Sequence, residues 1–157
     1  MQHDPFMRQA LKEALKAYAK GEVPVGAVVV HSGEIIGRGH NLRETSQDPT
    51  THAEIIAIRE AARNTGSWRL EGCDLYVTLE PCLMCAGAIS LSRIRKVFFG
   101  ASDPKAGAIV TCVRAFDFEW LNHIPDFESG LSETTSSALL SRFFEHLRRR
   151  KKLLTAD

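Results

Sequence analysis

Four residues in two short segments constrain this chain more than any other feature of its sequence. His52 and Glu54 stand at the start of the aliphatic run THAEIIAIRE, and Cys82 and Cys85 follow in LEPCLMCAGAI. A core helix gains nothing obvious from a histidine at its start, and the end of a strand gains nothing obvious from two neighbouring thiols. Any fold proposed for this chain must therefore account for these four side chains together.

The composition is that of one globular domain. Of the 157 residues, 44% are apolar and 25% are charged, which is enough for a real hydrophobic core in a single domain over residues 1–157. The apolar runs are too short to cross a bilayer, and the opening MQHDPFMRQA lacks a signal-peptide pattern. Four cysteines without a secretory signal favour a reducing compartment, where close cysteines more often bind metal than form disulfides. We therefore expect a cytoplasmic protein with no membrane segment.

The net charge of +1 conceals an uneven distribution of charged residues. Residues 141–152, SRFFEHLRRRKK, include six arginines or lysines and a single glutamate. Such clustering creates a local positive field that the net charge does not reveal. By itself, however, the run from Arg148 to Lys152 is typical of the solvated end of a helix.

Helical and strand patterns alternate along the chain. Asp4 followed by Pro5 is typical of a helix start, and Gly21 is typical of a helix end. The Ser32-Gly33 turn signal between two apolar runs predicts a β-hairpin. Helices are expected at about 5–20, 52–64 and 82–92 and from about 133 onward, strands at 25–31, 34–41, 73–79 and 95–100, a loop at 42–51, and no clear element over 103–122.

Helices interspersed with strands predict an α/β fold, in which helices cover the faces of one layered sheet. Helices connect the later strands, so the central part of the sheet is expected to be parallel. The last helix carries an apolar stripe that is expected to pack in the hydrophobic core. The stripe comprises Leu139, Leu140, Phe143, Phe144 and Leu147.

The four opening residues suit a catalytic zinc site. Cys82 and Cys85 are one helical turn apart, so both sulfurs project from the same side, and a helix N-terminus favours the thiolate form that binds metal. With His52 they supply three ligands to one tetrahedral Zn²⁺ and leave a position open, as in catalytic sites. Zinc lowers the pKa of a water in that position to roughly 7. Glu54, two residues from the histidine, is the candidate general acid/base.

These residues form the HAE and PCxxC signature of the zinc-dependent deaminases. Through the further stretches EVPVGAVVV, GRGHN, LYVTLEPCLMCAGAI and SRIRKVFFGASDPKAG, the chain resembles bacterial tRNA-specific adenosine deaminases over nearly its whole length. The resemblance implies a three-layer α/β/α, cytidine-deaminase-like fold with a central mixed five-stranded sheet. The chain would then be one zinc-dependent deaminase domain that ends in a basic helix.

The same resemblance implies hydrolytic deamination of adenosine to inosine at the wobble position of a tRNA anticodon, in bacteria mainly an arginine tRNA. Hydroxide would attack C6 of the adenine, while Glu54 moves protons to N1 and to the departing amine. The anticodon stem-loop suits such a pocket because its loop nucleotides can be splayed out of the stack. The resemblance also implies a homodimer, with the RNA surface drawn from both subunits.

Further site residues follow from the resemblance. Asn41 would hydrogen-bond the target base, although an asparagine at the end of a strand is equally expected as a turn residue. The backbone at Ala53 and Leu79 would read the edge of the base, and Asp103 and Lys105 would border the flanking nucleotides. Phosphate contacts are expected from three arginines of the basic run: Arg148, Arg149 and Arg150. Although the apolar stripe of the last helix is expected to pack in the core, enzymes that the chain resembles place aromatic residues of this helix near the RNA.

Three other residues have simpler interpretations. Glu80 is a rival carboxylate beside the thiols, but it is expected to fix the turn or to orient a ligand. Cys73 and Cys112 are expected to be buried, inert thiols. The stretch GAIVTCVRAFD and Ile124 depart from similar sequences, which read G-S-L and Arg at those places. These departures bear on the packing beside the RNA and not on the zinc chemistry.

Two alternative functions remain open on the sequence. A deaminase of free guanine, cytosine or cytidine would share the HAE and PCxxC segments, but it has no need of the basic C-terminal helix. A zinc-stabilised RNA-binding module without activity would need neither Glu54 nor an open coordination position. The products formed from an anticodon stem-loop and from free bases would separate these functions.

Overall fold

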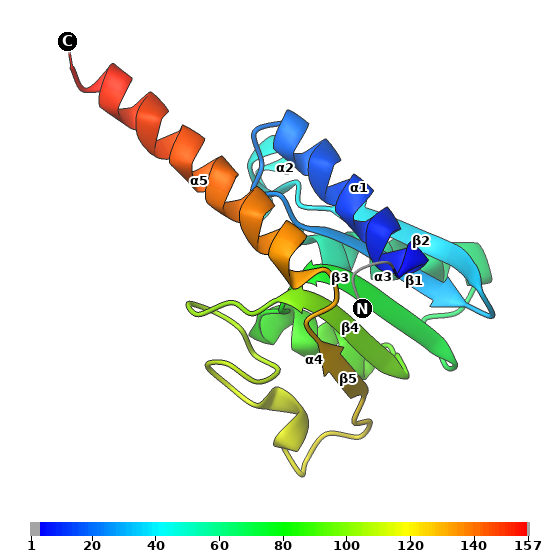
Figure 1. Cartoon of the computed structure of the whole chain (residues 1–157). Helices are drawn as coiled ribbons and strands as arrows, with labels where there is room; N and C mark the ends of the chain where they lie inside the picture. Colours follow the sequence, from blue (N-terminus) through cyan, green and yellow to red (C-terminus); the bar gives the residue numbers. More distant parts are fainter. Residues whose placement is uncertain (1–3, 157) are drawn as a thin grey trace.

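A five-stranded sheet in the order β2-β1-β3-β4-β5 forms the middle layer of the molecule (Figure 1). The strands are β1 (Gly26–His31), β2 (Glu34–His40), β3 (Cys73–Leu79), β4 (Lys96–Ala101) and β5 (Asp126–Ser129). Strand β1 pairs antiparallel with β2 and β3, whereas the β3–β4 and β4–β5 pairs are parallel. The predicted mixed five-stranded sheet and its parallel part are thus confirmed. Strand β5 lies beyond the segments in which the sequence predicted strands.

The computed structural model describes residues 4–156 of the chain. Residues 1–3, the start of the segment predicted to lack a signal-peptide pattern, lie outside this part, as does residue 157. The helices are α1 (Pro5–Ala19), α2 (Arg43–Ser46), α3 (Ala53–Thr65), α4 (Leu83–Leu91) and α5 (Glu133–Leu154), with a 3₁₀ turn, η1 (Ala115–Asp117). No helix among the described residues is both long and apolar enough to cross a membrane.

Helices cover both faces of the sheet, which gives the predicted three layers. Helices α1 and α5 lie on one face, and α3 and α4 lie on the other (Figure 1). Alternation along β1 sends Val28 and Val30 toward α1, where they pack with Met7. It sends Ala27 and Val29 into the larger core on the opposite side of the sheet. The two cores therefore hold the sheet rigidly between the helical layers.

Glycines allow the helices to approach the sheet closely. A Cβ atom on Gly26 would overlap the backbone of α1 at Ala10, and one on Gly39 would overlap the backbone of α3 at Ala53. Only glycine accommodates this approach, because it carries no side chain. The contact at Gly39 fixes the first turn of α3 against β2, and this turn carries the functional residues.

The helix and hairpin signals of the sequence act as predicted. Asp4 Oδ1 accepts hydrogen bonds from the amides of Phe6 and Met7 at 2.8 and 3.0 Å, so it caps α1. Ser32 and Gly33 both have positive φ, 49° and 80°, as a tight hairpin turn requires. The predicted loop 42–51 differs in containing the short helix α2.

Helix α5 extends beyond the body of the molecule (Figure 1). Tyr18 from α1 packs edge-on against Phe143, and its hydroxyl lies 2.7 Å from Nδ1 of His146. Phe143 is buried, but Phe144 and Leu147 are 41% and 37% exposed. The predicted core stripe is therefore wrong at Phe144 and Leu147, because the sheet that would cover them ends before α5 does.

Candidate metal centre and active site

The three candidate metal ligands meet where α3 and α4 begin. His52 is the N-cap of α3, Cys82 is the N-cap of α4, and Cys85 lies in the first turn of α4. Neither N-cap side chain hydrogen-bonds its own helix, so the imidazole and the thiol are available to each other. Two helix N-termini directed at one point also favour negative charge there, and hence thiolates.

The distances between these side chains fit a zinc ion. The Nδ1 atom of His52 lies 3.6 Å from the sulfur of Cys82 and 3.7 Å from the sulfur of Cys85. A tetrahedral zinc with ordinary bond lengths separates a nitrogen and a sulfur ligand by about 3.6 Å. Within residues 4–156, no fourth histidine, cysteine or carboxylate joins this group. The chain thus provides three ligands for one zinc ion and leaves a coordination position open.

The pKa values of the three candidate ligands shift in different directions. The hydrogen bond from Cys85, together with the neighbouring His52, lowers the pKa of Cys82 to about 4. That hydrogen bond and burial raise the pKa of Cys85. The contact with Cys82 also raises the pKa of His52. The lowered pKa of Cys82 favours its thiolate form, and zinc binding would displace any proton held by His52 or Cys85.

Glu54 lies beside the ligand group without being part of it. The residue is 4% exposed, and its Oε2 atom lies 3.0 Å from the sulfur of Cys85. Burial raises the pKa of Glu54, because a carboxylate loses hydration in the interior. A carboxyl group with a raised pKa can exchange protons near neutral pH, as a general acid/base must.

A pocket of about 200 Å³ opens over these residues. Its walls include the predicted residues Asn41, Ala53, Leu79 and Asp103 together with His52, Glu54 and Cys82. Asn41 is held in place: Oδ1 accepts from the amide of Arg43 at 3.2 Å, and Nδ2 donates to the carbonyl of Val23 at 3.3 Å. One donor and one acceptor of its amide remain for a bound molecule.

Several pocket residues were missed by the sequence reasoning. Val23, Val25 and Arg43 also line the pocket. Buried Glu22 accepts hydrogen bonds from the amides of Glu44 and Thr45 at 3.0 and 2.7 Å, and so fixes the first turn of α2 beside Arg43. The only signal for these residues is their position in EVPVGAVVV or, for Arg43, two residues after GRGHN; both stretches carry the resemblance.

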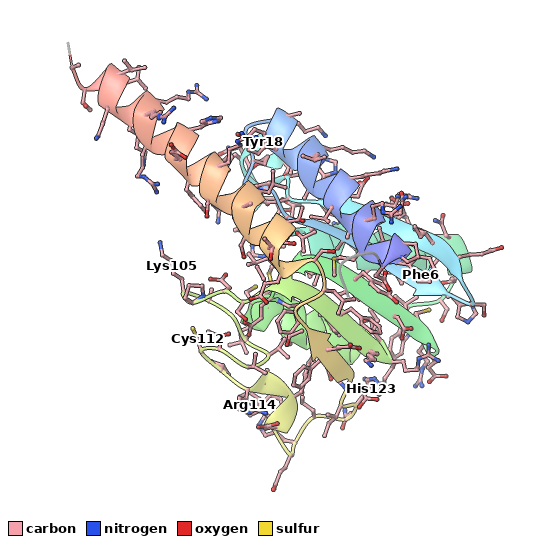
Figure 2. All side chains as sticks on the ribbon, viewed as in Figure 1. Phe6, Tyr18, Lys105, Cys112, Arg114 and His123 are labelled. Atoms are coloured by element: carbon pink, nitrogen blue, oxygen red, sulfur yellow. The ribbon has the colours of Figure 1, made fainter. Side chains whose placement is uncertain are left out.

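A second hollow of about 490 Å³ adjoins the pocket beneath α5. Val23, Leu79 and Asp103 line both spaces, so the two lie side by side. Lys105 and Arg148 line the second hollow, as does exposed Phe144. Lys105 stands on the loop beside α5 (Figure 2). The pocket at the candidate metal centre therefore adjoins the hollow beside the basic helix.

The three arginines of the basic run differ in their surroundings. Arg148 lines the second hollow, whereas Arg149 and Arg150 do not. Arg149 instead forms an ion pair with Glu145 of the preceding turn at 2.8 Å. Only Arg148 of the three thus lines the hollow, and the phosphate contacts expected of all three stay predictions.

Glu80 does not act as a metal ligand in this arrangement. Its carboxylate accepts hydrogen bonds from the loop 103–111, in agreement with the expectation that it fixes a turn. Of the other two cysteines, Cys73 is buried as predicted. Cys112 is exposed, so its predicted burial is wrong; it directly follows that loop on the surface (Figure 2).

Comparison with known proteins agrees with this geometry. Residues 1–101 match the sequence model of the cytidine and deoxycytidylate deaminase zinc-binding region. The chain is 54% identical over 151 residues to the tRNA-specific adenosine deaminase of Bacillus subtilis, a match that spans 96% of this chain and 94% of that protein.

Solved structures show the same fold. One from a study of A-to-I editing by tRNA:A34 deaminases at the wobble position of transfer RNA matches with a TM-score of 0.84 and 50% identity, over 86% of this chain and 98% of that one. A guanine deaminase from Bacillus subtilis matches with a TM-score of 0.62 and 36% identity, over 90% and 94% of the two chains. The chain belongs to the cytidine and deoxycytidylate deaminase family of zinc-binding enzymes, and within it to the group of the tRNA-specific adenosine deaminases.

Proposed function

We propose that this protein converts adenosine to inosine by hydrolytic deamination at the wobble position of a tRNA anticodon, with an arginine tRNA as the expected substrate. The observation that carries the proposal is a pair of adjoining hollows, an inner pocket at the ligand group and an outer part beside the basic helix, which share Val23, Leu79 and Asp103. The candidate zinc ligands and a buried carboxyl group lie at the floor of the inner pocket, and Lys105 and Arg148 line the outer part. A free base would fill the pocket alone, whereas a nucleotide within a chain needs the outer part for its neighbours.

The chemistry follows from the side chains at the floor of the pocket. His52, Cys82 and Cys85 would hold zinc, which would supply a water with a pKa lowered to about 7. Glu54 would carry one proton from water to N1 of the adenine as the hydroxyl group adds to C6, and a second proton from that hydroxyl group to the departing amine. Asn41 offers its free donor and acceptor to the edge of the base. Ammonia leaves, and the base keeps an oxygen at C6.

The outer part of the space suits an anticodon loop. Ala53 and Leu79 line the inner pocket, where their backbone would read the base. Asp103 borders both spaces and Lys105 the outer one, where the flanking nucleotides would lie. Single-stranded loops present splayed bases to such sites, so little energy is needed to place one adenine at the floor.

We further propose that the protein is a homodimer formed through α4. Leu83 and Leu91 of this helix are 56% and 70% exposed, and Trp120 is 75% exposed. Leu91 and Trp120 also line one shallow apolar hollow together with Gly87. Contiguous apolar surface of this kind is typical of protein interfaces, and the same patch on a second copy would cover it.

The oligomeric state tests this interface directly. Leu91→Glu should convert the dimer to a monomer in light scattering coupled to gel filtration, because it places a charge in an apolar contact. Leu15→Glu is the matched control, since Leu15 is 55% exposed on α1, across the sheet from α4. A wild-type monomer, or equal dissociation of both variants, would refute the interface.

The proposed activity is tested by incubating the zinc-loaded protein with an anticodon stem-loop that carries adenosine at the wobble position. Inosine is read as guanosine when the reacted RNA is reverse-transcribed and sequenced. Guanine, cytosine and cytidine are tested in parallel, since a guanine deaminase shares the fold and 36% of the matched residues. Release of ammonia from a free base without editing of the RNA would favour the alternative function.

A cytoplasmic location accompanies the proposed function. All four cysteines are free thiols, as is typical of a reducing compartment. Cys112 is exposed and would be prone to oxidation elsewhere. Fractionation of cells, with the protein detected by antibody, checks this location.

A further inference from the structure

We infer that Glu80 is a positioning residue for RNA: it holds the loop 103–111 in the conformation in which Asp103 and Lys105 border the pocket. Glu80 would then govern affinity for the substrate, while Glu54 governs the chemical step. The inference rests on the proposed function for its RNA part. Its structural part, the hold on the loop, can be tested without RNA.

The carboxylate of Glu80 is the centre of a hydrogen-bond network in the interior. Glu80 is 2% exposed. Its Oε2 atom accepts from the consecutive amides of Ile109, Val110 and Thr111 at 3.1, 2.9 and 3.0 Å. Its Oε1 atom accepts from the amide of Asp103 at 3.2 Å and from the hydroxyl of Thr111. An ionised carboxylate can accept all of these bonds because it has no hydrogen of its own.

The loop is folded directly around this side chain. A Cβ atom on Gly107 would overlap the Glu80 carboxylate, so the loop passes over it where only glycine fits. The amide of Ala108 also donates to the carbonyl of Pro81, next to Glu80, at 2.8 Å. The loop is therefore attached to the segment that leads into Cys82, and both carboxylate oxygens of Glu80 are hydrogen-bonded to the loop.

The two attachment points enclose the residues expected to meet RNA. Glu80 holds Asp103 at one end and residues 109–111 at the other. Between them, Asp103 Oδ1 accepts from the amides of Lys105 and Ala106 at 3.0 and 3.3 Å, so the turn continues as one unit. Asp103 and Ala106 line the pocket, and Lys105 lines the hollow beneath α5. Releasing Glu80 would thus loosen the outer wall and leave the floor in place.

Three variants separate this role from others. In Glu80→Gln, an NH₂ group faces amide donors, so at least one buried N–H loses its acceptor. Thr111→Val keeps the shape of the residue and removes only its hydroxyl, and Thr111→Ser restores that hydroxyl. Each zinc-loaded variant is titrated with the anticodon stem-loop and assayed in single-turnover deamination at saturating RNA.

For Glu80→Gln we expect the Kd for the stem-loop to rise about tenfold or more, the loss of one charge-assisted buried bond being enough for this. The saturating rate should change less than about threefold, since residues that position a substrate act mainly on binding. Thr111→Val should show a smaller rise in Kd, and Thr111→Ser should restore wild-type affinity. Zinc content should stay at about one per chain in all three variants.

Hydrogen exchange in the zinc-loaded protein without RNA decides the structural part. The amides of Ile109, Val110 and Thr111 should exchange faster in Glu80→Gln and in Thr111→Val. Unchanged exchange and unchanged affinity would overturn the inference, as would loss of zinc or a saturating rate that falls as much as the affinity. If the wild-type protein neither binds nor edits the stem-loop, the proposed function fails, and the exchange data still decide whether Glu80 holds the loop.

Discussion

The carboxyl group of Glu54 lies 3.0 Å from the sulfur of Cys85, almost out of reach of solvent. A carboxylate beside a metal site serves either as a further metal ligand or as a proton carrier, and the two roles have different geometry. Among the described residues, the group of possible metal ligands consists of His52, Cys82 and Cys85 and does not include Glu54. Glu54 faces the pocket instead, where a substrate and a water would lie.

Glu54→Gln should therefore retain zinc and lose nearly all deamination. Glutamine keeps the shape of the side chain but cannot carry protons, and general acid/base catalysis typically contributes about 10²–10⁴-fold. Single-turnover rates on the stem-loop and metal analysis of the same preparation provide the two measurements. Normal turnover would remove the proposed mechanism, and loss of zinc would make Glu54 a ligand.

Two of the four cysteines should be required for zinc binding and the other two should not. Cys82→Ser and Cys85→Ser should lose the zinc, because each removes one of three ligands. Cys73→Ser and Cys112→Ser should keep about one zinc per chain, since neither sulfur belongs to the ligand group. Elemental analysis after gel filtration measures this. A need for Cys73 or Cys112 would indicate a different, closed metal site.

At the scale of elements, α3 and α4 act through their first turns. Gly39 lets α3 lie directly on β2, and the parallel β3 and β4 strands on either side of α4 set where that helix begins. Both helices therefore start at the same edge of the sheet, and their N-caps supply His52 and Cys82. Helix α5 contributes differently, through the side chains that it holds over the hollow beside the pocket.

Arg148 should contribute more to RNA binding than Arg149 or Arg150. Each phosphate contact that is lost should make the slope of log affinity against log salt shallower by about 0.7–0.9. Arg148→Ala should show this full change, whereas Arg149→Ala should show less because Arg149 already pairs with Glu145. Zinc content should stay the same, and the saturating rate should fall less than the affinity.

The measurement is a titration of the stem-loop at several salt concentrations, with Arg150→Ala as the matched control. Arg150 lies two residues further along the same helix and does not line the hollow. Equal slopes for wild type and all three variants would make this end of α5 a solvated helix, and RNA contacts would have to be sought at Lys105.

At the scale of the whole molecule, the candidate metal ligands come from two segments that are far apart in the chain. These segments lie on either side of β3, and Cys85 is part of the buried interior. An ion that binds only the folded state stabilises it by mass action, by about 2.7 kcal/mol at a hundredfold excess over the Kd. Folding and metal binding should therefore be coupled.

Removing zinc with a chelator should lower the Tm of the wild-type protein by about 5–10 °C, since a domain of this size loses about 2–4 °C per kcal/mol. Differential scanning fluorimetry with and without chelator measures the change. Cys82→Ser is the control, because it should already have the lower Tm and should not respond to the chelator. An unaltered wild-type Tm after the metal has been removed would contradict this coupling.

Local sequence determined the elements and the chemistry of this protein. The Asp4 cap, the Ser32-Gly33 turn and the apolar periods predicted most helices and strands, because these signals act over a few neighbouring residues. The residue types at His52, Glu54, Cys82 and Cys85 identified zinc-dependent chemistry, since few other functions need this set.

Tertiary structure alone decided how distant segments meet. The position of β5, the exposure of Phe144 and Cys112, and the partners of Glu80 depend on contacts between residues far apart in the chain. The spacing of apolar residues along a short segment carries no information about such contacts. The carboxylate of Glu80 meets Thr111 only because the parallel strands β3 and β4 end side by side, so that the loop after β4 returns over the segment that leads into Cys82.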